Sequence, residues 1–280
     1  MSVSLKHFAT SSLLFTAALL IHQTPVVAAE FYLDWVEQAE AGQWPDGSQS
    51  GSFDIGGGTI DIDFTVGDGI DFVGFSDSGV TPAVTSVLNG ANSDEDPSLH
   101  LQVDADQVGL GDGDYAITMN TYFKGYSDPL EEVSFWLHDI DISLRGLWQD
   151  RVSIMGYLDN QVVAPNFEFL DPSANTAERV DEFTLDGIDA VENDSSAGDV
   201  QVSFTQSIDR WSLTYTDGDD ISRLINPNGH GIGVGDIYFR LPEERDDSKN
   251  IPEPSASLAL LLVGACFSGL KGYLRSKLSV

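Results

Sequence analysis

Hydrophobic alternation with a period of two is the feature that most constrains the fold of this chain. In residues 59–66, Ile60, Ile62 and Phe64 alternate with threonine and aspartate. A β-strand points successive side chains to opposite faces, so one face of such a segment enters a core and the other meets water. The same alternation recurs in residues 99–103, 115–119, 133–137, 152–154, 200–204, 211–215 and 237–241.

Turn-forming residues separate these segments and predict many short strands. Glycine, aspartate and asparagine cluster at residues 67–69, 111–114 and 226–229, as is typical of tight turns. Residues 30–44 mix apolar and acidic side chains and favour a short amphipathic helix or an edge strand. The pattern therefore predicts an all-β fold, a β-sandwich of jelly-roll type, over residues 30–241.

The charge of the chain is strongly acidic. Lysine and arginine number 13 against 45 aspartate and glutamate residues, which gives a formal net charge of -32. A surface of this sign repels nucleic acid and anionic lipid, so we expect no nucleic-acid partner. It serves either for solubility or for holding bound cations such as Ca²⁺. The one cysteine, Cys266, lies near the C-terminus, which excludes disulfides and cysteine-based zinc sites from residues 30–241.

The N-terminal residues 1–29 have the three parts of a secretory signal peptide. Lys6 gives a positive start, residues 8–21 form an uncharged and mostly apolar stretch, and small residues precede a cleavage site after Ala29. This pattern predicts an exported protein whose mature chain begins at Glu30.

The C-terminal region predicts a membrane-spanning helix. Residues 254–270 carry no charge and are mostly apolar, and at about 1.5 Å of rise per residue a helix of this length just crosses the hydrocarbon layer. Lys271, Arg275 and Lys277 follow, at the end that stays cytoplasmic by the positive-inside rule. The charged residues 242–251 are expected to form an acidic linker between the folded body and this helix.

A short proline motif, Pro252, Glu253 and Pro254, marks the start of the apolar segment. Together with the basic tail it resembles, over residues 252–280, the PEP-CTERM sorting signal of exopolysaccharide-producing Gram-negative bacteria. The resemblance implies recognition and cleavage near the motif by an exosortase, with release to the cell surface or extracellular matrix. The basic residues here are interspersed with other types, whereas the family's tail is often a dense arginine cluster. The alternative is a plain C-terminal anchor that keeps the protein in the cell envelope.

The alternation changes phase at two places, and each break carries an aspartate. The phase changes at residues 138–139, after the segment 133–137, and again at residues 235–236, before the segment 237–239. One extra residue in a strand produces a β-bulge, which re-aims side chains and often borders a functional site. We therefore predict a bulge at each place.

The aspartates after the first break have the spacing of a cation site. Asp139 and Asp141 point to the same side of a strand, about 7 Å apart at the backbone, and Asp150 follows in the next loop. Three carboxylates of this kind predict an oxygen cage for Ca²⁺. With the late segment 235–239, the cluster resembles the jelly-roll, lectin-like modules of secreted bacterial surface proteins. The alternative is that the two aspartates belong to the solvated face of an ordinary strand.

Aromatic residues near this cluster predict a glycan-binding surface. Tyr126 and Trp148 lie close to the aspartates in the sequence, and sugar rings pack their C–H faces on such side chains. The chain has no His-Glu-x-x-His, Gly-x-Ser-x-Gly or Glu-x-Asp-x-x-Glu motif, so we expect no enzymatic activity.

These observations predict a secreted, non-enzymatic protein of the cell surface or extracellular matrix that binds exopolysaccharide or another surface glycan, aided by Ca²⁺. Its expected partners are an exosortase-like processing enzyme and, through the C-terminal helix before processing, the membrane. Two alternatives stay open. One is a surface glycoside hydrolase or lyase, and the other is a purely structural matrix protein.

Overall fold

The computed structural model describes residues 29–75, 79–90, 97–106, 115–174, 176–193, 195–221 and 229–242. The predicted signal peptide up to residue 28, the predicted linker beyond residue 242 and the predicted sorting signal with Pro252, Glu253 and Pro254 lie outside the described residues. Within the part of the chain that is described, no helix is long and apolar enough to cross a membrane.

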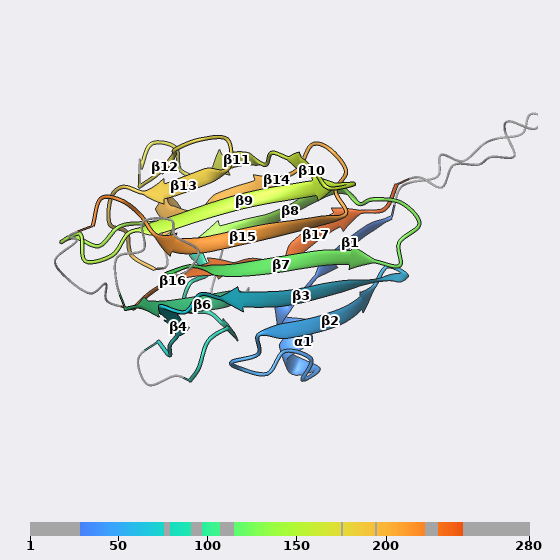
Figure 1. Cartoon of the computed structure of the whole chain (residues 1–280), viewed down its shortest axis with the longest axis horizontal. Coiled ribbons are helices and arrows are strands. Elements are labelled where there is room, and N and C mark those ends of the chain that lie inside the picture. The colour runs from blue at the N-terminus through green and yellow to red at the C-terminus, as the bar shows by residue number, and fades with distance from the viewer. Residues whose placement is uncertain are drawn as a thin grey trace, which may run out of the picture.

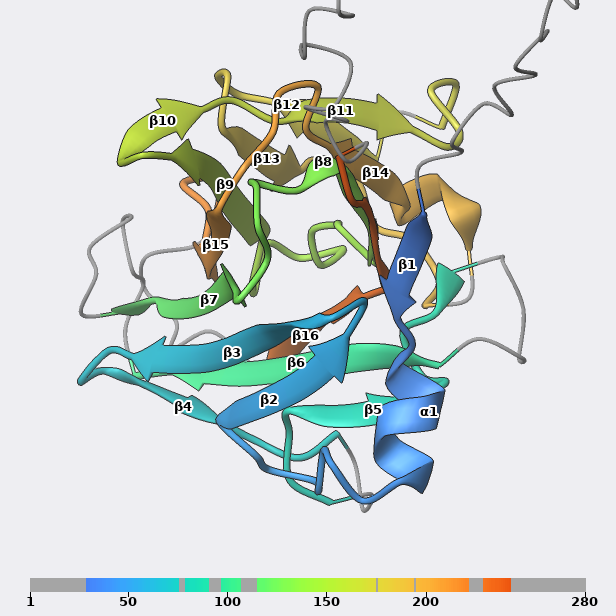
Figure 2. The ribbon, with the colours of Figure 1, turned by 90° about the vertical axis from the view of Figure 1, so that its right-hand side faces the viewer.

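Two antiparallel sheets pack face to face, which confirms the predicted all-β sandwich (Figures 1 and 2). The first sheet contains β1 (Glu30–Leu33), β17 (Ile237–Arg240), β8 (Glu131–His138), β16 (His230–Val234), β6 (Ser98–Ala105), β4 (Ile70–Phe72), β5 (Ala83–Thr85), β14 (Val200–Ser203) and β11 (Asn166–Phe169). The second contains β12 (Ala177–Arg179), β13 (Thr184–Gly187), β9 (Asp150–Leu158), β15 (Arg210–Asp217), β7 (Ile117–Lys124), β3 (Gly58–Val66), β2 (Ser50–Ile55) and β10 (Gln161–Val163). The helical elements that lie wholly within the described residues are the α-helix α1 (Trp35–Glu40) and the 3₁₀ turn η3 (Ser196–Gly198).

The core lies between the sheets and is built by the predicted alternation. Ile60 and Ile62 of β3 are fully buried, whereas Asp61 between them faces outward and bonds Lys124. Across the sandwich, Phe135 of β8 stacks on Trp211 of β15 with 4.3 Å between ring centroids. Because each large apolar side chain stabilises the fold by about 1.5–3 kcal/mol when it is buried, a one-residue slip of any such strand would be costly.

Residues 30–44 form both of the expected elements. They supply the edge strand β1 and the short helix α1, which packs beside β5 (Figure 2). Asp34 caps the helix, since its side chain accepts a hydrogen bond from Glu37 N at 2.9 Å. Trp35 then fixes the helix to the sheet, because its backbone N–H donates to Asp236 Oδ1 at 2.9 Å and its indole N–H donates to Gly235 O at 3.0 Å.

The second predicted bulge is confirmed, and it serves this helix. Val234 at the end of β16 pairs with Leu137, and Tyr238 of β17 pairs with Ser134, so the chain has one extra residue at 235–236 relative to β8. The bulge turns a backbone carbonyl and a carboxylate toward Trp35, as described above. It therefore positions α1 and does not border the pocket described below.

The first predicted bulge is a strand end instead. β8 stops at His138, and Asp139 has a φ of +65°, a left-handed conformation that turns the chain out of the sheet. β16 pairs with β6 along its whole length but with β8 only through Gly233 and Val234. The first residues of β16 thus lie beside the turn at Asp139 with no strand between them.

Candidate functional site

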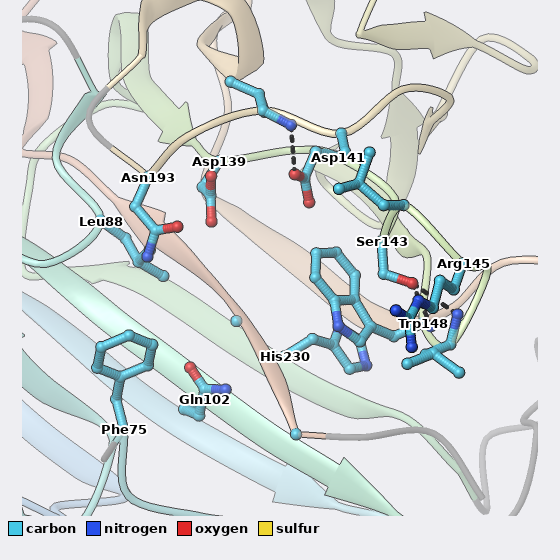
Figure 3. A pocket seen from close by; sticks show the side chains of 16 residues that line it. Phe75, Leu88, Gln102, Asp139, Asp141, Ser143, Arg145, Trp148, Asn193 and His230 are labelled. Atoms are coloured by element: carbon cyan, nitrogen blue, oxygen red, sulfur yellow. Dashed lines mark hydrogen bonds between the residues drawn. The ribbon is translucent and has the colours of Figure 1, made fainter. Parts of the chain in front are cut away.

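A cavity of about 440 Å³ lies where β8 stops (Figure 3). Its walls come from the turn after β8, the loop before β9, the start of β16, and β6, which pairs with β16. The side chains that matter most to its chemistry are Phe75, Gln102, Asp139, Asp141, Trp148 and Asn193.

Asp139 and Asp141 form the acidic part of the wall. They are only 8% and 2% exposed, and the Oδ1 atom of each has no hydrogen-bond partner among the described residues. Asp141 Oδ2 accepts a hydrogen bond from Val191 N at 2.9 Å (Figure 3). Each carboxyl group therefore keeps one buried oxygen whose hydrogen bond must come from a ligand or from water.

The end of β13 and the start of β9 hold the backbone of Asp141 in place. A Cβ atom on Gly187 would lie 1.9 Å from Asp141 O, so the end of β13 reaches this close only because residue 187 is glycine. Gln149 Nε2 donates to Gly187 O at 2.7 Å, and Asp150 N donates to Asp141 O at 2.9 Å. These bonds hold the carboxyl pair on a rigid support.

Asp150 lies next to the pair, but both of its oxygens are engaged. Oδ2 accepts from Asp141 N at 3.1 Å, and Oδ1 accepts from the Tyr215 hydroxyl and lies 2.9 Å from His230 Nδ1. On the other side of the imidazole, His230 Nε2 is 3.2 Å from Asp217 Oδ1. The side chains of Asp150, Tyr215, His230 and Asp217 are all buried, and His230 links this network to the cavity wall.

Burial controls the protonation of the carboxyl pair. Burial, together with repulsion from neighbouring carboxylates of which Asp141 is the strongest, raises the pKa of Asp139 to about 9. Burial and repulsion from Asp150 raise the pKa of Asp141 to about 8. Both groups therefore hold their protons at neutral pH.

The imidazole of His230 also holds its proton at neutral pH, but for a different reason. Burial lowers its pKa, but the attraction of the Asp150 and Asp217 carboxylates more than offsets that effect and raises the pKa to about 10. Burial also raises the pKa of the Tyr215 hydroxyl well above its usual value. At neutral pH the ring is an imidazolium whose charge is shared with two buried aspartates.

Trp148 covers this network and borders the cavity. Its ring is stacked on that of His230, with 5.7 Å between centroids and 4° between planes. Ser143 holds the loop that carries it, since Ser143 Oγ accepts from Leu147 N at 2.6 Å and Ser143 N donates to Trp148 O at 3.1 Å. Gly146, with a φ of +58°, makes the turn between them.

A second histidine and aspartate lie behind Asp139. His138 Nδ1 is 2.9 Å from Asp199 Oδ1, and both side chains are buried. A Cβ atom on Gly90 would lie 2.1 Å from Asp199 Oδ2, so only glycine leaves room for this carboxylate. Asp199 is one of the neighbours whose charge raises the pKa of Asp139.

The three aspartates predicted to bind Ca²⁺ are neighbours in the structure. Asp139, Asp141 and Asp150 come together as the sequence indicated, although Asp150 is engaged with His230. Within the described residues, no group of three or more histidine, cysteine, aspartate or glutamate side chains is arranged to hold a metal ion. The calcium site stays a prediction.

Trp148 and Tyr126, the two aromatic residues predicted to bind a ligand, lie apart. Trp148 borders the cavity, but the Tyr126 hydroxyl donates to Ile55 O at 2.7 Å and its ring packs against Phe239. The structure therefore gives Tyr126 a packing role between the sheets. Ala29, the predicted cleavage site, is described, and β1 starts directly after it.

Several residues of the site had no signal in the sequence. His230, Tyr215 and Asp217 follow Asp150 by 65 residues or more along the chain, and no local motif links them. The one available signal was the change of phase after β8, which pointed to Asp139 and Asp141.

Comparisons with protein families, with curated proteins and with solved structures find no match to this chain. The geometry of the pocket therefore carries the functional argument by itself.

Proposed function

We propose that this chain is a non-enzymatic protein of the cell surface or extracellular matrix that binds a glycan in the pocket beside Trp148. The observation that carries the proposal is one cavity that combines an aromatic ring, two carboxyl groups and the amides of Gln102 and Asn193. Sugar rings present C–H faces that pack on aromatic rings, and hydroxyl groups that bond to carboxyl and amide groups.

The dimensions of the pocket support a ligand of this kind. Its volume of about 440 Å³ falls in the range of about 300–1,000 Å³ that is usual for small-molecule sites. Leu144, which is 90% exposed, and Phe75, which is 36% exposed, provide apolar surface at its rim. A short stretch of an oligosaccharide fits a site of this size and character.

The pKa values of the carboxyl pair favour binding over hydrolysis. Glycosidases divide the work between one protonated and one ionised carboxyl group, whose surroundings push their pKa values apart. Here burial pushes both pKa values up, to about 9 for Asp139 and about 8 for Asp141. A glycoside hydrolase or lyase is therefore the weaker proposal.

Export and sorting are part of the same proposal and rest on the sequence. The signal peptide ending at Ala29 and the motif Pro252, Glu253 and Pro254 support secretion and processing by an exosortase-like enzyme. The lectin-like, jelly-roll classification of the sandwich belongs here too. Ca²⁺ is the competing occupant of Asp139 and Asp141, and the experiment in the next subsection separates it from an organic ligand.

The test is retention of the purified full-length protein on a panel of immobilised bacterial polysaccharides. We expect retention on at least one of them, and we expect Trp148→Ala to weaken it by about tenfold or more, because stacking on a ring of this kind contributes about 1–2 kcal/mol. Tyr32→Ala is the matched control, since Tyr32 is an aromatic residue that is 59% exposed in β1. No retention on any polysaccharide would favour a purely structural matrix protein, and turnover of one would favour an enzyme.

A further inference from the structure

We infer that the pocket selects a sugar unit that carries a free, protonated amine; this rests on the proposed glycan binding. Asp139 Oδ1 and Asp141 Oδ1 are buried oxygens without a hydrogen-bond partner among the described residues. A cation that enters beside the two carboxyl groups lowers their pKa values, so they give up their protons to water and accept hydrogen bonds as carboxylates when the cation binds. An ammonium group has three N–H donors and no acceptor, so one such group satisfies both oxygens.

Neutral sugar groups match these two oxygens less well. A hydroxyl group has one donor to give, and an N-acetyl group has one amide N–H and a carbonyl oxygen that repels a carboxylate. Hydrogen bonds between charged partners are also shorter and stronger than neutral ones. Of these sugar substituents, a free amine therefore gains the most binding free energy from Asp139 and Asp141.

The protein itself supplies little positive charge to this carboxyl pair. Among the described residues that line the cavity, the basic side chains are Arg145 and His230. His230 is engaged with Asp150 and Asp217, and the exposed side chain of Arg145 lies across Trp148 from Asp139 in Figure 3. The pKa values of Asp139 and Asp141 are raised for this reason too, because no nearby cation offsets the effect of burial on the two carboxyl groups.

Aromatic groups and overall charge favour the same ligand. Trp148 and Phe75 border the cavity, and aromatic faces attract cations as well as C–H groups. The chain has a formal net charge of -32, which attracts a polycation and repels glycans rich in uronic acid. Charge complementarity thus separates amine-bearing glycans from the acidic ones that many cell surfaces carry.

The experiment compares three trisaccharides of equal linkage on the purified full-length protein by isothermal titration calorimetry. These are the glucosamine, N-acetylglucosamine and glucose trimers. We expect the glucosamine trimer to bind about tenfold or more tightly than either of the others, as an added charge-assisted hydrogen bond predicts. This comparison needs no variant, so it holds even if a substitution impairs folding.

Variants then assign the preference to the pocket. Asp139→Asn and Asp141→Asn should each abolish the preference for the amine, whereas Asp128→Asn, which alters an exposed acid outside the cavity, should leave it unchanged.

Equal affinity for all three trimers would overturn the inference and leave glycan binding intact. If none of the trimers binds but a polysaccharide from the retention panel does, only the inference fails; if neither binds, the proposed function fails with it. A rise in melting temperature with millimolar Ca²⁺ that Asp139→Asn removes would assign the pair to a metal ion instead.

Discussion

At the scale of single residues, buried carboxyl groups in this protein have two different fates. Asp150 accepts hydrogen bonds from Asp141 N and from the Tyr215 hydroxyl, and it lies beside the imidazolium of His230. Asp139 is also buried, but its Oδ1 has no hydrogen-bond donor among the described residues. A buried charge without such compensation is unfavourable, so the protonated form of Asp139 is the one that suits the folded state.

This difference predicts that stability falls as pH rises. The pKa values of about 9 for Asp139 and about 8 for Asp141 in the folded state lie above the value of 3.8 for the exposed group. The stabilisation is therefore fully present below the unfolded pKa and is lost as pH rises through the folded pKa values. His230, with a pKa raised from 6.5 to about 10, acts in the same direction. Melting temperatures measured between about pH 5 and pH 9 should decrease steadily.

Asp139→Asn is the variant that isolates this effect, because an amide cannot ionise. Its melting temperature should fall less steeply with pH than that of the unaltered protein, while Asp128→Asn should keep the original slope. Parallel pH profiles for Asp139→Asn and the unaltered protein would show that Asp139 is not the group responsible.

At the scale of elements, the loop between β8 and β9 decides the shape of the pocket. Ser143 bonds both Leu147 and the backbone of Trp148, so one side chain orients the ring that borders the cavity. Ser143→Ala removes an acceptor worth about 1 kcal/mol. We expect a small change in melting temperature but a loss of glycan affinity of roughly three- to tenfold, because the ring is no longer preorganised.

Ser212→Ala is the matched control for this prediction. Ser212 lies in β15 between the buried residues Trp211 and Leu213 and therefore faces outward. Its replacement should affect neither melting temperature nor affinity. Equal affinity of Ser143→Ala and the unaltered protein, measured by calorimetry, would mean that the loop keeps its shape without this bond.

The strands of the sandwich were predictable from the sequence because their signal is local. Alternation of apolar and polar residues places Ile60, Ile62, Phe135 and Leu137 correctly in the core. The order of strands in each sheet was not predictable, because pairings such as β1 with β17 join the two ends of the folded region. No pattern within a strand specifies such a distant partner.

The candidate site was likewise predictable only in part. The change of phase after β8 drew attention to Asp139 and Asp141, but it predicted a bulge within a strand, whereas the strand ends at His138 and the two aspartates follow it. The enclosure of Asp150 by Tyr215 and His230 depends on contacts between the two sheets. The sequence therefore indicated three carboxylates but not that one of them is already engaged.

At the scale of the whole molecule, the pocket lies at one end of the sandwich, and Glu30 and Arg240, near the two limits of the described region, lie at the other. Glu30 pairs with Arg240, and Arg240 pairs with Glu131 at the start of β8, whereas the pocket lies beyond His138 at its end. In Figure 1, β16 begins at the left-hand end and β17 finishes toward the right. At about 3.4 Å per residue, the length of β8 (Glu131–His138) separates the two by roughly 24 Å.

Sorting of the protein in its own host is tested by intact mass. We expect the mature protein to lack residues 1–29 and the region beyond about Pro254, as processing by an exosortase-like enzyme requires. Mass spectrometry of surface and membrane fractions distinguishes the outcomes. A mass that retains residues 258–280 would instead assign a permanent membrane anchor.

The placement of the pocket at the end of the sandwich opposite to Glu30 and Arg240 predicts that the direction of attachment matters for binding. In a Cys266→Ser background, which removes the one native cysteine, the Asp128→Cys variant offers a thiol in the loop before β8, at the end where β1 starts. The Leu144→Cys variant offers one at the rim of the pocket, where Leu144 is 90% exposed. Coupled to a solid support through these thiols, the first variant should keep its glycan-binding capacity and the second should lose most of it. Equal capacity in both orientations would mean that the glycan binds on a surface other than the pocket. A protein attached to a surface through the end of the sandwich where β17 finishes would, by this arrangement, hold its pocket away from that surface.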